Sequence, residues 1–200
     1  MSYKRGHRIP ILIVFTALFT GLPAVAYANI GLPMIFITLP WMVVSLIPVI
    51  AVEGHICSRR LDLTPGTAIK VTTASNLAST FIGIPITWGV LVALQMLTGG
   101  GGSHGIDTFL RKLLAVTWQA PWLIPYEKEF FWMVPSAGLV LMVPYFFASW
   151  LVEYQVSRRL LPEKDRKDVK RSVLYANLAS YALLELVIAS YLVYSVYFSS

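Results

Sequence analysis

Apolar residues fill five long stretches of the chain, and polar residues gather in the segments between them. The stretches are residues 9–28, 34–56, 71–97, 131–156 and 173–198. Each is long enough to cross the hydrocarbon core of a bilayer, which takes about 20 mostly apolar residues. A helix satisfies its backbone hydrogen bonds within the segment, so each stretch is predicted to be a transmembrane helix.

The first stretch has two interpretations. Three basic residues precede it, and Ala26-Tyr27-Ala28 at its end fits the small-x-small cleavage rule of a secretory signal. The apolar run is longer than a usual signal peptide has, which favours an ordinary first helix instead. Residues 1–28 are therefore expected to be a signal peptide or a fifth transmembrane helix.

Two parts of the chain have similar sequences. Glu53 follows a valine and precedes Arg-Arg-Leu and then Asn76-Leu-Ala-Ser, and Glu153 and Asn177 stand in the same order of neighbours. The Glu-to-Asn separation is 23 residues in one copy and 24 in the other. Both copies read as helix, basic loop, helix, so duplication of a helical hairpin is the preferred explanation over chance similarity.

The predicted fold is an all-α integral membrane protein with two tandem parallel-repeat transmembrane hairpins, four helices in all. Residues 29–97 form the first hairpin, residues 131–200 the second, and the outer loop 98–130 joins them. A parallel repeat of this kind places its pseudo-symmetry axis along the membrane normal.

The repeat predicts side-chain contacts within each hairpin. An antiparallel pair of helices brings Glu53 and Asn76 to a similar depth, and Glu153 and Asn177 likewise. An asparagine amide can donate to a carboxylate, and such interhelical bonds in membranes contribute about 0.6 kcal/mol on average. We expect these four residues to hold the hairpins together.

Composition agrees with the membrane assignment. Hydrophobic residues make up 56% of the 200 residues and charged residues 13%, against about 45–50% and about 25% in soluble domains. This excludes a soluble enzyme domain and a nucleic-acid binder, and the net charge of +6 calls for a membrane explanation. The single cysteine, Cys57, excludes an internal disulfide framework.

The basic residues set the expected orientation. Thirteen of the 16 Lys and Arg residues fall in the N-terminal segment and in loops 57–70 and 157–171. Basic loops remain in the cytoplasm, so both loops are predicted to be cytoplasmic, with loop 98–130 and the C-terminus outside. The expected location is the inner (plasma) membrane of a bacterium.

The outer loop carries an amphipathic segment. Asp107 is expected to cap a short helix from about Thr108 to Gln119, with apolar side chains at helical spacing and Arg111 and Lys112 on the flank. Such a helix would lie on the membrane surface. The alternative is a docking surface, or a lid over a cavity between the hairpins.

Catalytic and ligand-binding signatures are absent from the sequence. No zinc-protease, nucleophile-elbow, phosphate-loop or Cys-x-x-Cys motif occurs. Glu53, His55 and Cys57 are spaced by two, so on a helix they diverge and make a poor metal site. We expect no enzymatic activity, no cofactor and no metal.

Glu185 is the one acidic residue near the middle of a predicted span. A carboxylate at that depth costs about 2.5–3.5 kcal/mol on insertion scales. It is expected to face another helix or another protomer, near Tyr181 and Ser190. It would serve either as a neutral interhelical hydrogen-bonding group or as a proton or cation relay.

The first hairpin carries a partial resemblance to a known family. The succession of Glu53, a basic-Leu pair, Asn76-Leu-Ala-Ser79 and Gly83 is similar to the first hairpin of cyanobacterial filament-integrity (septal-junction) membrane proteins. The match covers residues 49–83, about 35 residues, and does not extend to the second hairpin. It implies a structural role at the cell envelope and a bacterial source.

The sequence therefore favours a non-catalytic, structural or accessory component of a membrane complex. Its expected partners are the lipid bilayer and either other membrane proteins or further copies of itself, and not nucleic acid. The alternative is a small proton- or cation-coupled transporter or channel that uses Glu185 and the hairpin interface.

Overall fold

The fold was analysed in a computed structural model that describes residues 32–99, 105–123 and 127–199. The predicted signal peptide or first span, residues 1–28, lies outside the described residues. The described part is helical except for a pair of two-residue strands, β1 (Leu32–Pro33) and β2 (Trp122–Leu123). The all-helical class is therefore as predicted.

Four helical segments are long and apolar enough to cross a membrane: Thr38–Leu61, Pro65–Thr98, Phe130–Leu160 and Arg166–Phe198. They agree with the four predicted spans beyond residue 28 and extend several of them toward the basic loops. This makes the chain a polytopic membrane protein. The corresponding helices are α2 (Met34–Leu61), α3 (Pro65–Ala78), the π-helical turn η1 (Ser79–Gly83), α4 (Ile84–Gly99), α6 (Phe130–Leu160) and α7 (Arg166–Ser199).

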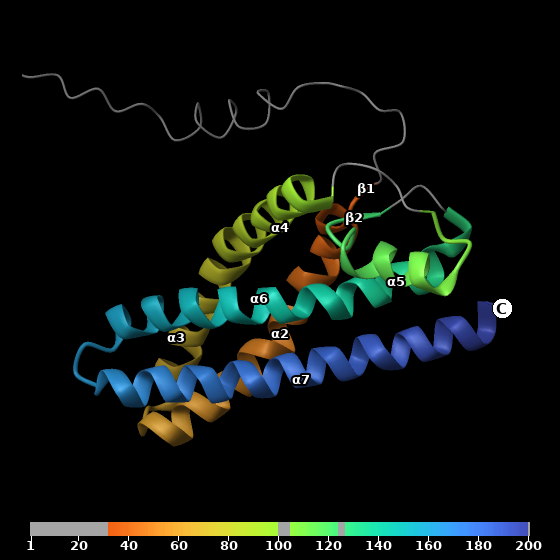
Figure 1. The fold of residues 1–200 in the computed structure, drawn as a ribbon. Helices are drawn as coiled ribbons and strands as arrows, with labels where there is room; N and C mark the ends of the chain where they lie inside the picture. The colour runs from red at the N-terminus through yellow and green to blue at the C-terminus, as the bar shows by residue number, and fades with distance from the viewer. Residues whose placement is uncertain (1–31, 100–104, 124–126, 200) are drawn as a thin grey trace, which may run out of the picture. The chain divides into compact units, whose positions relative to one another are not determined.

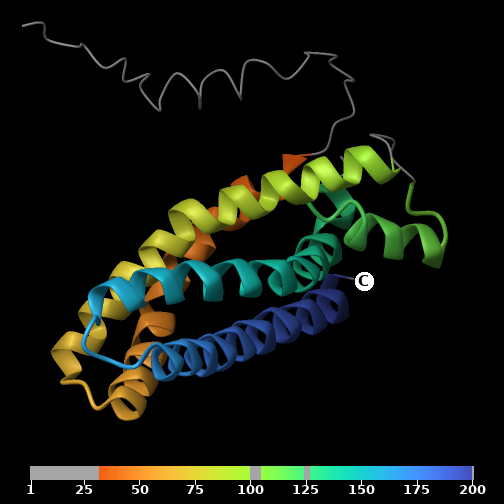
Figure 2. The same ribbon diagram turned by 60° about the vertical axis from the view of Figure 1, so that its left-hand side comes forward.

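The helices pack as two connected pairs. In the first hairpin α2 packs against α3, and in the second α6 packs along α7, as both views of the ribbon show (Figures 1 and 2). Across the hairpins, α2 contacts α7 and α3 contacts α6. The first helix of each hairpin therefore touches both helices that follow a basic loop.

Short capped loops turn the chain at the basic end. Thr64 precedes α3, and its hydroxyl oxygen accepts a hydrogen bond from the Thr67 backbone N–H. Asp165 precedes α7, and its carboxylate accepts from the backbone N–H groups of Lys167 and Asp168. Capping satisfies N–H groups that a helix leaves unpaired in its first turn. Both loops therefore end where a capped helix begins.

The helical segment from α3 to α4 contains a π-helical turn, whereas α7, the corresponding helix of the second hairpin, does not. The turn η1 lies between α3 and α4, and the Ile84 N–H reaches the Ser79 carbonyl five residues earlier. Pro85 follows at once and has no N–H to donate to the preceding turn. Wider turns of this kind reset the direction of a helix. Figure 1 shows α4 diverging from α6 beyond this point.

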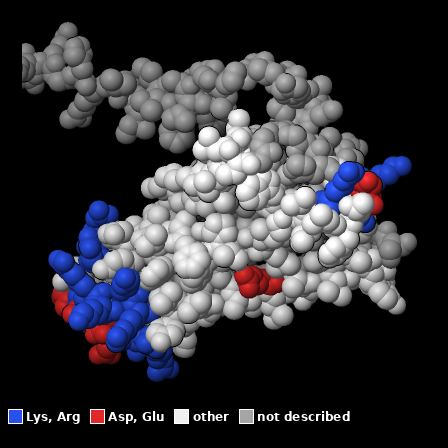
Figure 3. Space-filling model, viewed as in Figure 1, with Lys and Arg blue, Asp and Glu red and all other residues white. Residues whose placement is uncertain are grey.

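Charges gather at the two ends of the described part (Figure 3). The basic end comprises loops 57–70 and 157–171, with ten Lys or Arg residues against four acidic ones. Contacts join the two loops: the Arg60 guanidinium lies 4.2 Å from the centre of the Tyr175 ring, and Lys164 Nζ is 3.5 Å from the Asp62 carbonyl oxygen. The basic loops thus form one surface.

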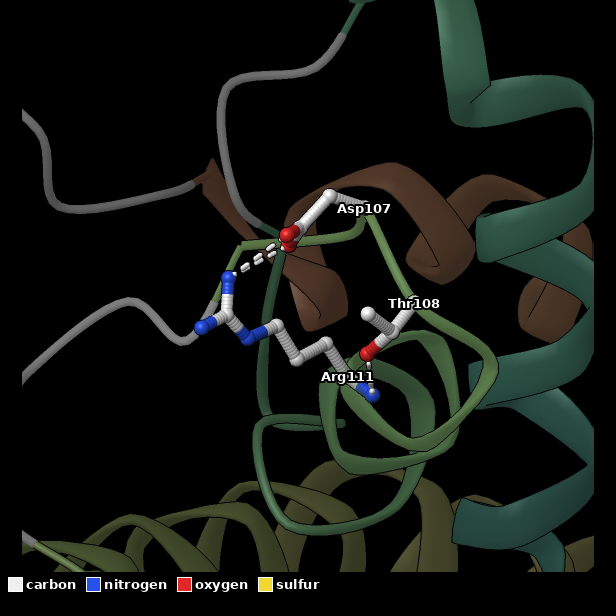
Figure 4. A network of polar contacts seen from close by, with 3 residues as sticks. All are labelled: Asp107, Thr108 and Arg111. Atoms are coloured by element: carbon white, nitrogen blue, oxygen red, sulfur yellow. Dashed lines mark hydrogen bonds and ion pairs between the residues drawn. The ribbon is translucent and has the colours of Figure 1, made fainter.

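At the opposite end, α5 (Phe109–Thr117) is shorter than the predicted Thr108–Gln119 helix, and its cap differs. The capping residue is Thr108, whose hydroxyl accepts from the Arg111 N–H, so the prediction of Asp107 as the cap was wrong. Asp107 instead forms an ion pair with Arg111 at 2.6 Å (Figure 4). Hydrogen bonding to that guanidinium lowers the pKa of the Asp107 carboxyl.

The connecting segment packs against both hairpins at the end opposite the basic loops. The carbonyl of Pro121 accepts hydrogen bonds from the Met34 backbone N–H and from the Trp88 indole N–H. Apolar side chains from α2, α4, α5 and α6 pack there into one core, and a second apolar core lies at the basic end. The members of the outer core are Met34, Ile84, Ala115, Val116, Ala120, Met133, Ala137, Leu141 and Tyr145.

Candidate functional site

Each hairpin contains the predicted asparagine–glutamate contact. Asn76 Nδ2 donates to Glu53 Oε2 at 2.6 Å, and Asn177 Nδ2 donates to Glu153 Oε2 at 2.8 Å. The second amide hydrogen of each asparagine goes to a backbone carbonyl one turn earlier in its own helix, that of Thr72 or Val173. The contacts predicted from the repeat are confirmed.

Two further contacts join the hairpins, and the sequence did not predict them. Ser180 Oγ lies 2.6 Å from Glu53 Oε1, and Ser79 Oγ lies 2.9 Å from Glu153 Oε1. Each glutamate is thus held by the asparagine of its own hairpin and by the serine of the other. The repeated Asn-Leu-Ala-Ser sequence carried the signal, because it places the serine one turn after the asparagine on the same helix face.

We call these six residues the polar cluster: Glu53, Asn76, Ser79, Glu153, Asn177 and Ser180. All are buried, with at most 3% of any residue exposed. The two carboxyl groups belong to one network, because Asn177 and Ser180, three residues apart on α7, contact Glu153 and Glu53 respectively. The cluster therefore occupies the place where the two hairpins meet.

The hydrogens available in the polar cluster limit its charge. Each serine hydroxyl has one hydrogen but two acceptors in reach, a glutamate oxygen and the backbone carbonyl of the asparagine three residues earlier. A protonated carboxyl group would supply the missing hydrogen. Chemically, the cluster can hold protons.

Burial follows the same order in the two hairpins. Residues 68–79 and 169–180 alternate between buried and exposed positions identically. Residues 51–61 and 151–161 also match, except that Gly54 is buried where Tyr154 is half-buried. The loop after Leu161 is one residue longer than the loop after Leu61, which accounts for the different Glu-to-Asn separations.

Glu185 lies away from the polar cluster. Its side chain is exposed on α7, and within the described residues no hydrogen bond reaches it. The predicted neighbours have other partners: the Tyr181 hydroxyl donates to Ser149 Oγ at 2.8 Å, and the Ser190 hydroxyl donates to the Leu186 carbonyl. The expectation that Glu185 faces another helix is therefore not met within residues 32–99, 105–123 and 127–199.

The candidate metal ligands do not converge. Glu53 and Cys57 are buried on α2, whereas the side chain between them, His55, is exposed. Within residues 32–99, 105–123 and 127–199, no three His, Cys, Asp or Glu side chains are grouped so that they could hold a metal ion. Among the residues that the structure describes, the acidic side chains buried in the bundle are those of Glu53 and Glu153.

Comparison of the chain with protein-family models, with curated proteins and with solved structures finds no match, so the geometry of the polar cluster carries the functional argument.

Proposed function

We propose that the protein is a non-catalytic structural or accessory component of a membrane complex in a bacterial cell envelope. Its four helices embed it in the bilayer, and it meets other membrane proteins through its helix surfaces and its outer segment. The partial resemblance of residues 49–83 to filament-integrity proteins points to the same kind of role.

The pairing of the two glutamates in the polar cluster supports this proposal best. Each of the four carboxyl oxygens of Glu53 and Glu153 has a side-chain hydrogen-bond partner within the bundle. Four segments are joined by these contacts, so the cluster fixes how the hairpins dock. The two carboxyl groups are thus occupied by side chains of the protein itself, whereas Asn177 Oδ1 is buried without a hydrogen-bond partner among the described residues.

We further propose that the hairpins arose by duplication. The matched burial of residues 68–79 and 169–180 supports this, and so do the matched contacts of each glutamate. In this arrangement each copy provides a serine for the other's glutamate, as the two halves of a symmetric dimer would. The contacts of the polar cluster then fix the position of one hairpin along the other.

A second candidate function is proton or cation movement. The observation that favours it is that two acidic side chains, Glu53 and Glu153, are buried in one hydrogen-bonded cluster in the bundle interior. Buried acids inside membranes often belong to proton pathways. In this version the relevant acids are those of the polar cluster rather than Glu185.

The deciding experiment compares wild type with the double variant Glu53→Gln/Glu153→Gln. Glutamine resembles a protonated glutamic acid in shape and has an amide group that donates through its two N–H bonds and accepts at its oxygen, but it cannot release a proton. Both proteins are reconstituted in liposomes for proton-flux measurement, and are also solubilised from native membranes in mild detergent to measure the mass of the complex.

The structural proposal predicts a complex heavier than the monomer for both proteins and no flux above empty liposomes. Glu53→Leu/Glu153→Leu serves as the disruptive control and should lose the complex, because leucine offers the serines and asparagines no acceptor. Flux in wild type that disappears in the folded glutamine variant would overturn the structural proposal and favour transport. A wild-type protein that migrates only as a monomer would also contradict it.

A further inference from the structure

An open pocket with a volume of about 600 Å³ lies at the basic end of the first hairpin. The end of α2 and the start of α3 form its walls, and Ala51, Gly54, His55, Arg59, Asp62 and Ile69 are among its lining residues. Apolar and ionic side chains share this pocket. It therefore suits a molecule that is itself amphipathic.

The pocket exists because the first hairpin lacks bulk that the second one has. The positions of Ala51 and Gly54 are taken in the second hairpin by Leu151 and Tyr154. Tyr154 is half-buried against the apolar core there. The Arg158 guanidinium lies 5.7 Å from the centre of its ring. In the second hairpin Tyr154 thus takes up the space beside the core that Gly54 leaves free in the first, whereas Leu151 is exposed.

Gly54 allows close contact between α2 and α3 at the wall of the pocket. A Cβ atom on Gly54 would come within 2.7 Å of Ile69 Cδ1, so a larger residue would push the helices or the isoleucine aside. Gly54 and Ile69 form an apolar part of the wall, and Ala51 lies one turn further into the span. An acyl chain could follow this side toward the membrane interior.

The charges around the opening favour an anion. Arg59 lines the pocket, and Pro65 places the N-terminal end of α3 at its wall, where the helix dipole is positive. Asp62 opposes them with a carboxylate, while Lys164 Nζ lies beside the Asp62 carbonyl. The whole basic end has six more basic than acidic residues, ten against four. Basic pockets at the cytoplasmic ends of transmembrane helices bind anionic headgroups.

We propose that this pocket binds one anionic phospholipid, with the phosphate beside Arg59 and an acyl chain along Ala51 and Ile69. The pocket gives the protein a lipid-recognition site in one hairpin only. The inference does not depend on the proposed function.

The test uses full-length protein purified in mild detergent and depleted of lipid. Phosphatidylglycerol, phosphatidylethanolamine and soluble glycerol phosphate are added in turn, and native mass spectrometry measures the bound species. Ala51→Leu places the residue of the second hairpin in the pocket without touching Gly54, and Arg59→Gln removes the charge. Arg159→Gln is the matched control, because Arg159 holds the corresponding place in the filled hairpin.

We expect one tightly bound phosphatidylglycerol on wild type and on Arg159→Gln. Binding should be at least about tenfold weaker on Arg59→Gln, which is the size of one charged hydrogen bond. A loss of similar size is expected for Ala51→Leu, because the larger side chain takes the space of the acyl chain. Equal binding to all four proteins would mean non-specific lipid and would overturn the proposal. Equal retention of phosphatidylethanolamine would contradict the choice of an anionic headgroup. Displacement of the lipid by glycerol phosphate at similar concentration would assign the pocket to a soluble phosphate compound instead.

Discussion

Each asparagine of the polar cluster uses both of its amide hydrogens, one on a glutamate of the neighbouring helix and one on a carbonyl of its own helix. The first bond joins two helices, whereas the second orients the side chain so that the first can form. A buried amide with both hydrogens engaged has little freedom to rotate. The asparagines therefore position the glutamates for the contacts with Ser79 and Ser180.

Replacing either asparagine should weaken the fold slightly and by a similar amount. Asn76→Leu and Asn177→Leu each remove one interhelical bond, and each should lower stability by about 0.6 kcal/mol. Thermal unfolding in detergent, followed by intrinsic tryptophan fluorescence, measures this. Ser190→Ala is the control, because Ser190 bonds only to its own helix. An unchanged melting temperature in both leucine variants would contradict the role given to these contacts.

The sequence was sufficient to predict four of the six residues of the polar cluster and two of the four contacts with its glutamates. The equal spacing of Glu and Asn in two hairpins predicted the contacts within each hairpin, because a short loop forces antiparallel helices into register. The contacts of Ser79 and Ser180 depend on how the hairpins dock, and neither spacing nor hydropathy determines docking. Those serines had been interpreted only as small residues that permit close approach.

At the scale of helices, α7 and the segment from α3 to α4 follow the same course at the basic end and differ beyond the polar cluster. The π-helical turn η1 redirects α4, and Ile84 becomes part of the outer core with 8% exposure. In α7 the corresponding residue is Glu185, and the uninterrupted helix leaves it exposed. The first hairpin thus buries Ile84 at the position where the second hairpin exposes Glu185.

The four spans were predictable from hydropathy because each is a long apolar run. The redirection at η1 was not, because Pro85 is compatible with a kink, a π-helical turn or a helix end. The exposure of Glu185 was also unexpected, since depth alone predicts that an acid is buried but not which molecule buries it.

Substitution of Glu185 tests whether the exposed face of α7 packs against a partner or takes part in proton transfer. If the carboxyl group only packs against a partner, Glu185→Gln should leave expression and assembly near wild type, because the amide keeps the shape and the hydrogen-bonding capacity. Mass of the complex in mild detergent and proton flux in liposomes are the two measurements. Flux lost in a normally folded Gln variant would instead assign Glu185 to a proton pathway.

At the scale of the whole molecule, the joined basic loops make a topology prediction. Both should face the cytoplasm, because positively charged loops resist translocation. A single cysteine at position 164, introduced as Lys164→Cys with Cys57→Ser, should react with an impermeant maleimide only after the cells are opened. A cysteine at Phe109 on α5 provides the opposite control. Labelling of position 164 in intact cells would reverse the orientation.

Intact mass decides the fate of the N-terminal stretch. Cleavage after Ala28 would leave a mature chain that begins at Asn29. A mass near 22.3 kDa, measured on protein purified from membranes, would instead mean that the first span is retained. The two outcomes differ by 28 residues, so mass spectrometry separates them without ambiguity.

The contacts between the hairpins can form only after the ribosome has synthesised the second hairpin. Glu53 precedes Ser180 by 127 residues, and Ser79 precedes Glu153 by 74. At about 5–20 residues per second, the ribosome completes Ser180 roughly 6–25 s after Glu53. Throughout that interval the newborn first hairpin holds an acid that lacks one of its donors. Such a half-built chain is suited to remain beside the insertion machinery until its second half arrives, and chains truncated before Ser180 should be recognised by membrane proteases.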